Sequence, residues 1–166
     1  THVDAYLIVM DGDSLVNAAG QVVVTRPDVI ATSDSLALDR ARETARFLRS
    51  PVIKGLGERP FTLTGSVIDL YSRERRLERV VSAVTAKVVS EDLEITSDTL
   101  DLRLADQRLQ RAFAWGASRA HAVTPTQDLR ADSLDMIMPG QRLEQVHAVG
   151  GAEARTKDRR RDRAWL

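Results

Sequence analysis

The chain contains 166 residues, which suits a single domain that buries about two thirds of the surface exposed by its unfolded form. Its 24 basic and 24 acidic residues cancel, so the overall charge gives no reason to expect nucleic acid or an anionic bilayer as a partner. The sequence has no cysteine, which excludes a disulfide framework, a thiolate metal site and a cysteine nucleophile. It also has no apolar run of the roughly 18 residues that a membrane-spanning helix needs.

Residues 1–30 are predicted to form a partial structural unit with two strands, over residues 5–10 and 15–25, joined by a turn. The turn contains Gly12-Asp13-Ser14-Leu15, which is also the nucleophile motif of one hydrolase family. That chemistry requires an α/β scaffold and a distal Asp-x-x-His sequence, which none of the histidines here completes. A turn in which Gly12 opens a strand explains these residues, so we expect no enzymatic activity and no catalytic residues.

From residue 31 onward, a short motif returns at a nearly fixed interval. Each copy has a polar residue two positions before an apolar anchor, and successive anchors stand 32 or 34 residues apart. The four anchors are Leu36, Ile68, Leu100 and Leu134. A fixed period of this length is typical of stacked arrays. We therefore expect repeats at about residues 31–60, 61–90, 91–125 and 126–154, which with residues 1–30 make one array over residues 1–154.

Apolar residues alternate with polar ones at every anchor, as in Leu100, Leu102 and Leu104. This period of two predicts β-strands with one face in a core. Residues 36–49 and 73–83 are rich in good helix formers, which favours the competing helical interpretation, but the period-two pattern contradicts a helical repeat. The predicted fold class is therefore all-β, with stacked antiparallel strands and two extended passes in each unit.

The second pass of each unit is predicted to keep the same register in all four copies, without a gap. Nine positions after the anchors stand Ala45, Leu77, Leu109 and Leu143, and twelve positions after them stand Leu48, Val80, Ala112 and Val146. Stacked units would enclose a shared apolar interior, with the anchors in columns. We expect the wall opposite the anchors to carry small side chains, namely Ser82, Ala86, Ala114, Ala148, Gly150 and Ala152.

Large residues that face small ones allow two interpretations. The first is ordinary interdigitation, which fills a core to the density of an organic crystal. The second is an open apolar trough that accepts acyl chains. In that case the predicted lipid-lining residues are Leu36, Leu38, Ile68, Leu70, Val80, Leu100, Leu102, Leu104, Leu134, Met136, Met138 and Val146.

The histidines, one pair of aromatic residues and the C-terminal residues lead to three further expectations. The histidines His2, His121 and His147 lack the close spacing of metal ligands, so we expect no metal site and no cofactor. Phe113 and Trp115 are predicted to occupy opposite faces of one strand, so that only one joins the core and the other marks a partner surface or the groove rim. Residues 155–166 are expected to be a charged C-terminal tail or the start of a further repeat.

The second passes carry a family resemblance. The segments Arg142–Ala152 and Arg76–Ala86 resemble the closing Arg-Leu-x-x-Val-x-Ala-x-Gly-x-Ala pattern of the OstA-like repeat found in lipopolysaccharide-transport proteins of the LptA type. Residues 108–112 are similar to the opening of the same pattern. The resemblance covers about residues 3–154. The first unit departs from the pattern, because Ala45 replaces the usual Leu.

The resemblance implies a bent, V-shaped β-jelly roll, also called a β-taco, in the periplasm of a Gram-negative bacterium. It implies a non-enzymatic protein that binds lipopolysaccharide or a related glycolipid and carries it toward the outer membrane along an apolar groove. The implied partners are this glycolipid, other OstA-like transport components and, through open edge strands, further copies of the chain in an end-to-end homo-oligomer. The alternative is a polymerising β-solenoid scaffold without a ligand.

Overall fold

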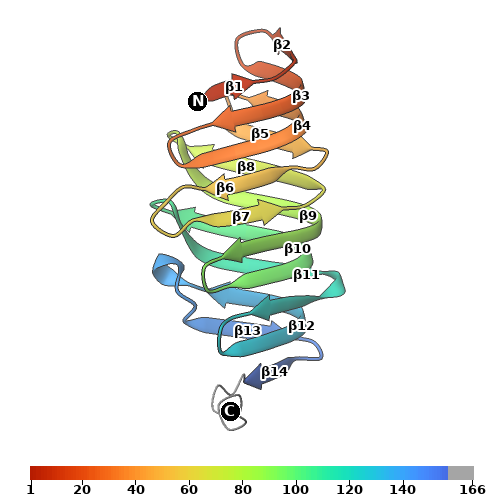
Figure 1. The fold of residues 1–166 in the computed structure, drawn as a ribbon, viewed down its shortest axis with the longest axis vertical. Helices are drawn as coiled ribbons and strands as arrows, with labels where there is room; N and C mark the ends of the chain where they lie inside the picture. The colour runs from red at the N-terminus through yellow and green to blue at the C-terminus, as the bar shows by residue number, and fades with distance from the viewer. Residues whose placement is uncertain (157–166) are drawn as a thin grey trace, which may run out of the picture.

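The computed structural model describes residues 1–156 and consists of antiparallel strands stacked along one long axis (Figure 1). The strands are β1 His2–Asp4, β2 Leu7–Asp11, β3 Leu15–Thr25, β4 Val29–Asp39, β5 Thr44–Leu48, β6 Val52–Gly55, β7 Phe61–Thr64, β8 Val67–Arg73, β9 Arg76–Ser90, β10 Glu94–Ala105, β11 Arg108–Val123, β12 Gln127–Ile137, β13 Gln145–Val149 and β14 Glu153–Thr156. A short 3-10 turn, η1, spans Pro139–Gln141. The all-β, antiparallel prediction is confirmed.

The strands form one sheet that folds into two facing walls. Long strands such as β9, β10, β11 and β12 bend near their middle and contribute one half to each wall. Wall one contains residues 7–11, 15–19, 35–39, 44–48, 67–73, 76–83, 99–105, 108–115, 133–137 and 145–149. Wall two contains residues 2–4, 22–25, 29–32, 52–55, 61–64, 86–90, 94–97, 120–123, 127–131 and 153–156.

The bend between the walls, here called the corner, explains the recurring polar residue of the sequence motif. Asp132 donates its backbone N–H to the carbonyl of Gly150 at 2.8 Å, and Asp34 donates to Arg49 at 3.1 Å. The accepting residues lie in the left-handed region, with φ of 81° at Gly150 and 62° at Arg49. This conformation turns the strand from one wall into the other. The polar side chain also contributes, since Asp98 Oδ2 accepts the backbone N–H of Ser118 at 2.6 Å, so the repeated polar residue has an architectural role.

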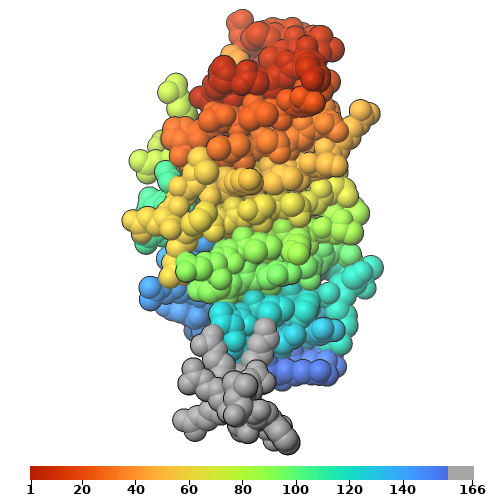
Figure 2. Space-filling view, in the orientation of Figure 1, coloured from red at the N-terminus to blue at the C-terminus, as the bar shows by residue number. Residues whose placement is uncertain are grey.

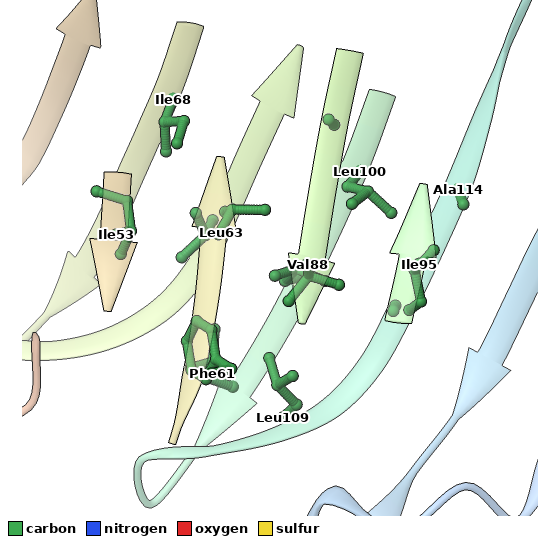
Figure 3. Close-up of a cluster of buried hydrophobic side chains, with 14 of the residues drawn as sticks. Ile53, Phe61, Leu63, Ile68, Val88, Ile95, Leu100, Leu109 and Ala114 are labelled. Atoms are coloured by element: carbon green, nitrogen blue, oxygen red, sulfur yellow. The ribbon is translucent and has the colours of Figure 1, made fainter. Parts of the chain in front are cut away.

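The core lies between the walls and is made of their inward-facing side chains. Figure 3 shows Ile68, Leu100 and Ala114 of wall one in the same cluster as Leu63 and Val88 of wall two. All five are buried. The space-filling view shows the successive strands as closely packed bands along the long axis (Figure 2). Burial of this continuous apolar interior stabilises the stack, since no single unit can bury its own inward face.

The structure corrects the predicted position of the small residues. Ser82 lies beside both Ile68 and Leu100 in wall one, and Ala114 lies beside both Leu100 and Leu134 in the same wall. Large and small side chains therefore alternate across one wall instead of facing each other from two. The reason is the tight turn that follows the strand carrying each anchor. This turn places the next strand, with its small residues, beside that strand in the same wall. The small residue Ala86 does lie in wall two.

The predicted gap-free register is wrong in the first unit. Leu70 pairs with Val80, Leu102 with Ala112 and Met136 with Val146, each ten residues apart, whereas Leu38 pairs with Ala45 after only seven. The first hairpin is therefore three residues shorter than the others. As a result Ala45, not Leu48, takes the inward position equivalent to Val80.

Strand β14 ends at Thr156, so the first two residues of the predicted charged tail belong to a strand. The rest of that prediction, residues 157–166, lies outside the described residues.

Candidate apolar binding cleft

A cleft opens between the two walls at the N-terminal end of the array, with a volume of about 530 Å³. Its cause is the short first hairpin. In later units the hairpins reach one row further, and that row is filled by the buried side chains Leu77, Leu104, Leu109 and Met138. In the first unit the chain already turns back at residues 40–43, so this row is missing. The residues lining the cleft are Thr1, Val3, Val24, Arg26, Leu36, Leu38, Arg40, Glu43, Thr44, Ala45, Phe47, Leu70, Ser72 and Arg75.

The inner surface of the cleft is apolar. Leu36 and Phe47 are buried, and Leu38 and Ala45 are partly buried and pack against the core. Ala45 lies between Leu38 and Leu70 in the pairing of wall one, and its methyl group leaves space where a larger side chain would fill the cleft. These side chains give the cleft a surface suited to a hydrocarbon chain.

The mouth of the cleft is polar and mainly basic, because Arg40 and Arg75 line it together with Arg26, whose guanidinium is paired with Asp28 at 3.1 Å. The one carboxylate among the lining residues, Glu43, accepts hydrogen bonds from the backbone N–H groups of Glu74 at 3.0 Å and Arg75 at 2.7 Å. This carboxylate is therefore bound to the neighbouring turn. An apolar interior with a basic mouth can hold an amphiphile whose acyl chain points inward and whose anionic group stays at the surface.

The predicted lipid-lining residues all face the same interior, but they do not share one open space. Leu36, Leu38 and Leu70 line the cleft. Val146 is only partly buried near the C-terminal end. The remaining predicted residues are packed inside the filled core, and they are Ile68, Val80, Leu100, Leu102, Leu104, Leu134, Met136 and Met138. Their role as lipid contacts stays a prediction.

Sequence reasoning missed the half of the cleft that comes from wall two and from the first residues. Val3 and Val24 belong to the partial unit, where no anchor motif marks them, and Phe47 was hidden by the incorrect register of the first hairpin. The replacement of the usual Leu by Ala45 was the available signal, since a small residue at one position of a repeat suggests local space.

The outer face of wall one carries a ladder of ion pairs between neighbouring strands. The pairs are Arg46–Asp69 at 2.8 Å, Arg79–Asp101 at 2.8 Å and Arg111–Asp135 at 2.5 Å. The hydrogen bond that each arginine donates to its Asp partner raises the pKa of the arginine above the ordinary value in all three pairs. These cross-strand pairs tie one unit to the next along the array.

The predicted separation of Phe113 and Trp115 onto opposite faces is wrong, because residues two apart on a strand share a face. Their ring centroids lie 4.8 Å apart, on the outer side of wall one. The inward positions of this strand are held by Ala112 and Ala114. Neither aromatic ring therefore belongs to the core between the walls.

Other candidate chemistry finds little support in the described part of the chain. Ser14 lies in the turn between β2 and β3, where its carbonyl accepts the N–H of Arg40 at 2.8 Å. His121 is hydrogen-bonded to Asp128 at 2.8 Å and His2 to Asp4 at 3.2 Å. Among residues 1–156 no group of three or more His, Asp or Glu side chains could hold a metal ion. In the same range no helix has the length and hydropathy needed to cross a membrane.

The fold of this chain is similar to that of a protein of known structure. Neither protein-family models nor curated proteins give a match to the sequence. The crystal structure of LptH from Pseudomonas aeruginosa, the LptA homologous periplasmic component of the conserved lipopolysaccharide transport device, is similar to the chain with a TM-score of 0.59. The match covers 70% of this chain and 82% of LptH, at 20% sequence identity. The chain therefore has the LptA-type fold of OstA-like β-repeats.

Proposed function

We propose that this protein is a non-enzymatic, periplasmic component of lipopolysaccharide transport that holds the acyl chains of the glycolipid between its two walls. The observation that carries the proposal is the cleft at the N-terminal end, with apolar inner walls and with Arg40 and Arg75 at its mouth. Support comes from the likeness in fold to LptH, a protein of a lipopolysaccharide transport device. Delivery of the lipid toward the outer membrane is part of this proposal.

The size of the cleft limits what it can hold in the closed structure. Its volume of about 530 Å³ falls within the roughly 300–1,000 Å³ of ordinary small-ligand sites. Such a space suits a portion of an amphiphile, such as one acyl chain, while a glycolipid with several chains needs the walls to part further. The cleft is thus proposed as the first contact of the lipid, and the interior beyond it as the path.

The two ends of the array are the proposed contact surfaces for other OstA-like transport components or for a second copy. Within residues 1–156, β2 at the N-terminal end pairs only with β3, and its residues Leu7, Ile8, Val9 and Met10 are exposed. At the C-terminal end β13 pairs only with β12 among the described strands. Each of these edge strands thus leaves one row of backbone N–H and C=O groups without a strand partner in the described part of the chain, and that row can pair with a strand from another chain.

A specific observation also favours the alternative, a polymerising β-solenoid scaffold without a ligand. The side chains of Leu100, Leu102, Leu134 and Met136 are each 0% exposed, so the interior of the later units is filled in this structure. A permanently closed core would have no room for lipid. The two functions therefore differ in whether the protein binds a glycolipid.

Two matched substitutions on neighbouring strands test the proposal. Ala45→Phe places a ring in the cleft, whereas Ala37→Phe places the same ring on the exposed outer side of wall one. Binding of purified lipopolysaccharide would be measured by native mass spectrometry and by titration with a fluorescent derivative. We expect the unaltered protein and Ala37→Phe to bind, and Ala45→Phe to bind at least about tenfold more weakly. Self-association without any adduct in all three would support the scaffold instead.

A further inference from the structure

Two polar bridges join the free edges of the walls, opposite the corner. The first bridge, here called latch one, connects the turn after β3 in wall two with the hairpin of β8 and β9 in wall one. Arg26 donates from Nη1 to Ser72 Oγ at 2.8 Å and from Nη2 to the carbonyl of Arg75 at 2.7 Å. Asp28 Oδ2 accepts the backbone N–H of Leu77 at 3.2 Å. Latch one therefore fixes a wall-two turn to a wall-one hairpin more than forty residues away.

Latch one is held together by an internal ion pair. Arg26 Nε lies 3.1 Å from Asp28 Oδ1, and the side chains are only 13% and 11% exposed. This pairing orients the guanidinium so that its two terminal nitrogens reach Ser72 and Arg75. Arg26, Ser72 and Arg75 also line the cleft, so latch one stands at the boundary between the cleft and the filled interior.

The second bridge, here called latch two, is the loop of residues 56–60, which crosses from wall two to the edge of wall one. Glu58 forms an ion pair with Arg108, and the carbonyl of Arg59 accepts a hydrogen bond from Gln141 Nε2 at 2.8 Å. The other end of that amide is also used, because Gln141 Oε1 accepts the N–H of Leu109 at 3.3 Å. Gln141 is itself buried, although it lies in the turn between β12 and β13.

Latch two also involves close backbone contact. A Cβ atom built on Gly57 would lie 2.6 Å from the carbonyl oxygen of Gln107 and 3.3 Å from its Cβ. The loop therefore rests directly on the turn between β10 and β11. Through these contacts, the loop of residues 56–60 covers the edge of the interior beside β10, whose residues Leu100 and Leu102 are fully buried.

We propose that latch one and latch two form a lateral gate, and that both must open before acyl chains can pass from the cleft into the interior. This inference rests on the function proposed above. Three observations support it. The interior behind the latches is filled, the latches are polar contacts between segments distant in sequence, and latch one contains three of the residues that line the cleft. When the latches open, their polar groups can exchange their protein partners for water, whereas separating the apolar inner faces exposes groups that water cannot satisfy.

The lack of cysteine in the chain allows a clean test of the gate. The double variant Gly57→Cys with Gln107→Cys places two thiols across latch two. The separation of 3.3 Å between the two Cβ positions is slightly below the roughly 3.5–4.5 Å seen in disulfides, and the new Cβ at residue 57 also meets the carbonyl oxygen of Gln107 at 2.6 Å, so the turn must shift slightly to admit the bridge. Because the reduced and oxidised forms of this variant both carry that shift, the comparison between them isolates the effect of the bridge. Oxidation would hold the wall edges together, and a reductant would release them in the same sample.

A second pair of cysteines controls for the effect of a disulfide in itself. Lys54→Cys with Thr62→Cys joins the paired strands β6 and β7 within wall two, without crossing between the walls. The probe is purified lipopolysaccharide with a fluorescent label, and the readouts are the rate and the final amount of lipid taken up, with disulfide formation checked by intact mass.

Three outcomes decide the question. We expect the oxidised latch variant to load at least about tenfold more slowly than its reduced form, while the control pair loads equally in both states. Equal loading of the oxidised and reduced latch variants would overturn the gate and leave the proposed function intact. If no variant takes up lipid, even when reduced, and the unaltered protein also fails, the proposed function and the gate are both overturned.

Discussion

Asp135 accepts two hydrogen bonds from Arg111 on the neighbouring strand, from Nε at 2.8 Å and from Nη2 at 2.5 Å. The same relationship returns at Arg79 and Asp101, one unit earlier. Each of these aspartates directly follows an anchor residue in the sequence and points to the opposite side of wall one. The anchor motif therefore encodes both an inward apolar contact and an outward ion pair between units.

The ion pair between Arg111 and Asp135 makes the free energy of unfolding depend on pH. The hydrogen bond from Arg111 holds the pKa of Asp135 below its ordinary value. Because the folded pKa is lower than the unfolded value of about 3.9, the stabilisation is complete above that value and is lost as pH falls through the folded pKa. We expect Asp135→Asn to cause a small loss of stability at pH 7, and the difference from the unaltered protein to disappear at lower pH.

Urea unfolding followed by circular dichroism between pH 7 and pH 2 measures this effect. Glu91→Gln is a suitable control, because Glu91 is an exposed carboxylate in the turn between β9 and β10. A difference between Asp135→Asn and the unaltered protein that grows as pH falls would contradict the expected sign.

The anchors should carry much of the stability of the array. Leu100 is fully buried between the walls, so Leu100→Ala removes apolar contacts and leaves a cavity. We expect the free energy of unfolding to fall by about 2–5 kcal/mol. Val149→Ala is the matched control, since Val149 is exposed on the terminal strand β13, and a change within about 0.5 kcal/mol is expected there. Equal losses for both variants in urea titrations would show that the anchors do not form the main core.

The left-handed backbone at the corner predicts that one substitution to glycine stabilises the protein. Val84 has φ of 60°, in the left-handed region, and occupies the same corner position as Gly150 in the last unit. Its side chain is 57% exposed, so little packing is lost on its removal. We expect Val84→Gly to relieve backbone strain of about 1–2 kcal/mol, partly offset by the larger entropy of glycine in the unfolded chain. A thermal midpoint below that of the unaltered protein would contradict this explanation of the corner.

The exposed edge at the N-terminal end predicts association that a charge can block. Ile8 lies on the edge strand β2 and faces the open end of the apolar interior beside Ala18. We expect Ile8→Lys to reduce concentration-dependent association in sedimentation velocity, because a buried lysine at a strand interface is unfavourable. Val89→Lys, in the middle of the array, is the control and should leave association unchanged. The same association for both lysine variants would place the contact elsewhere.

Much of the fold is predictable from local patterns. The anchors alternate with polar residues over several positions, and this pattern alone predicted strands whose inward residues, such as Ile68 and Leu134, are buried. Every copy repeats the same information, so errors in one unit do not affect the others. The antiparallel arrangement followed in the same way, because short turns between alternating segments join neighbouring strands.

The features that the sequence analysis missed or predicted wrongly depend on contacts between distant residues or on the length of a turn. The period did not reveal that the first hairpin is shorter, so Ala45 and Phe47 were assigned incorrectly, and with them the cleft. Latch two joins Arg59 to Gln141, 82 residues apart in sequence, and no local pattern marks such a contact. Whether the walls enclose a filled core or an open trough depends on how side chains of both walls meet, which alternation does not determine.

Lipid is proposed to occupy the space between the walls, and two adjacent positions on β4 distinguish this space from the outer surface. A photo-crosslinking amino acid at Leu38 points into the cleft, whereas the same group at Ala37 points to the outer side of wall one. After incubation with lipopolysaccharide and irradiation, we predict a crosslinked adduct from position 38 and little or none from position 37. Crosslinking from position 37 alone, or equally from both, would show that lipid does not bind specifically between the walls.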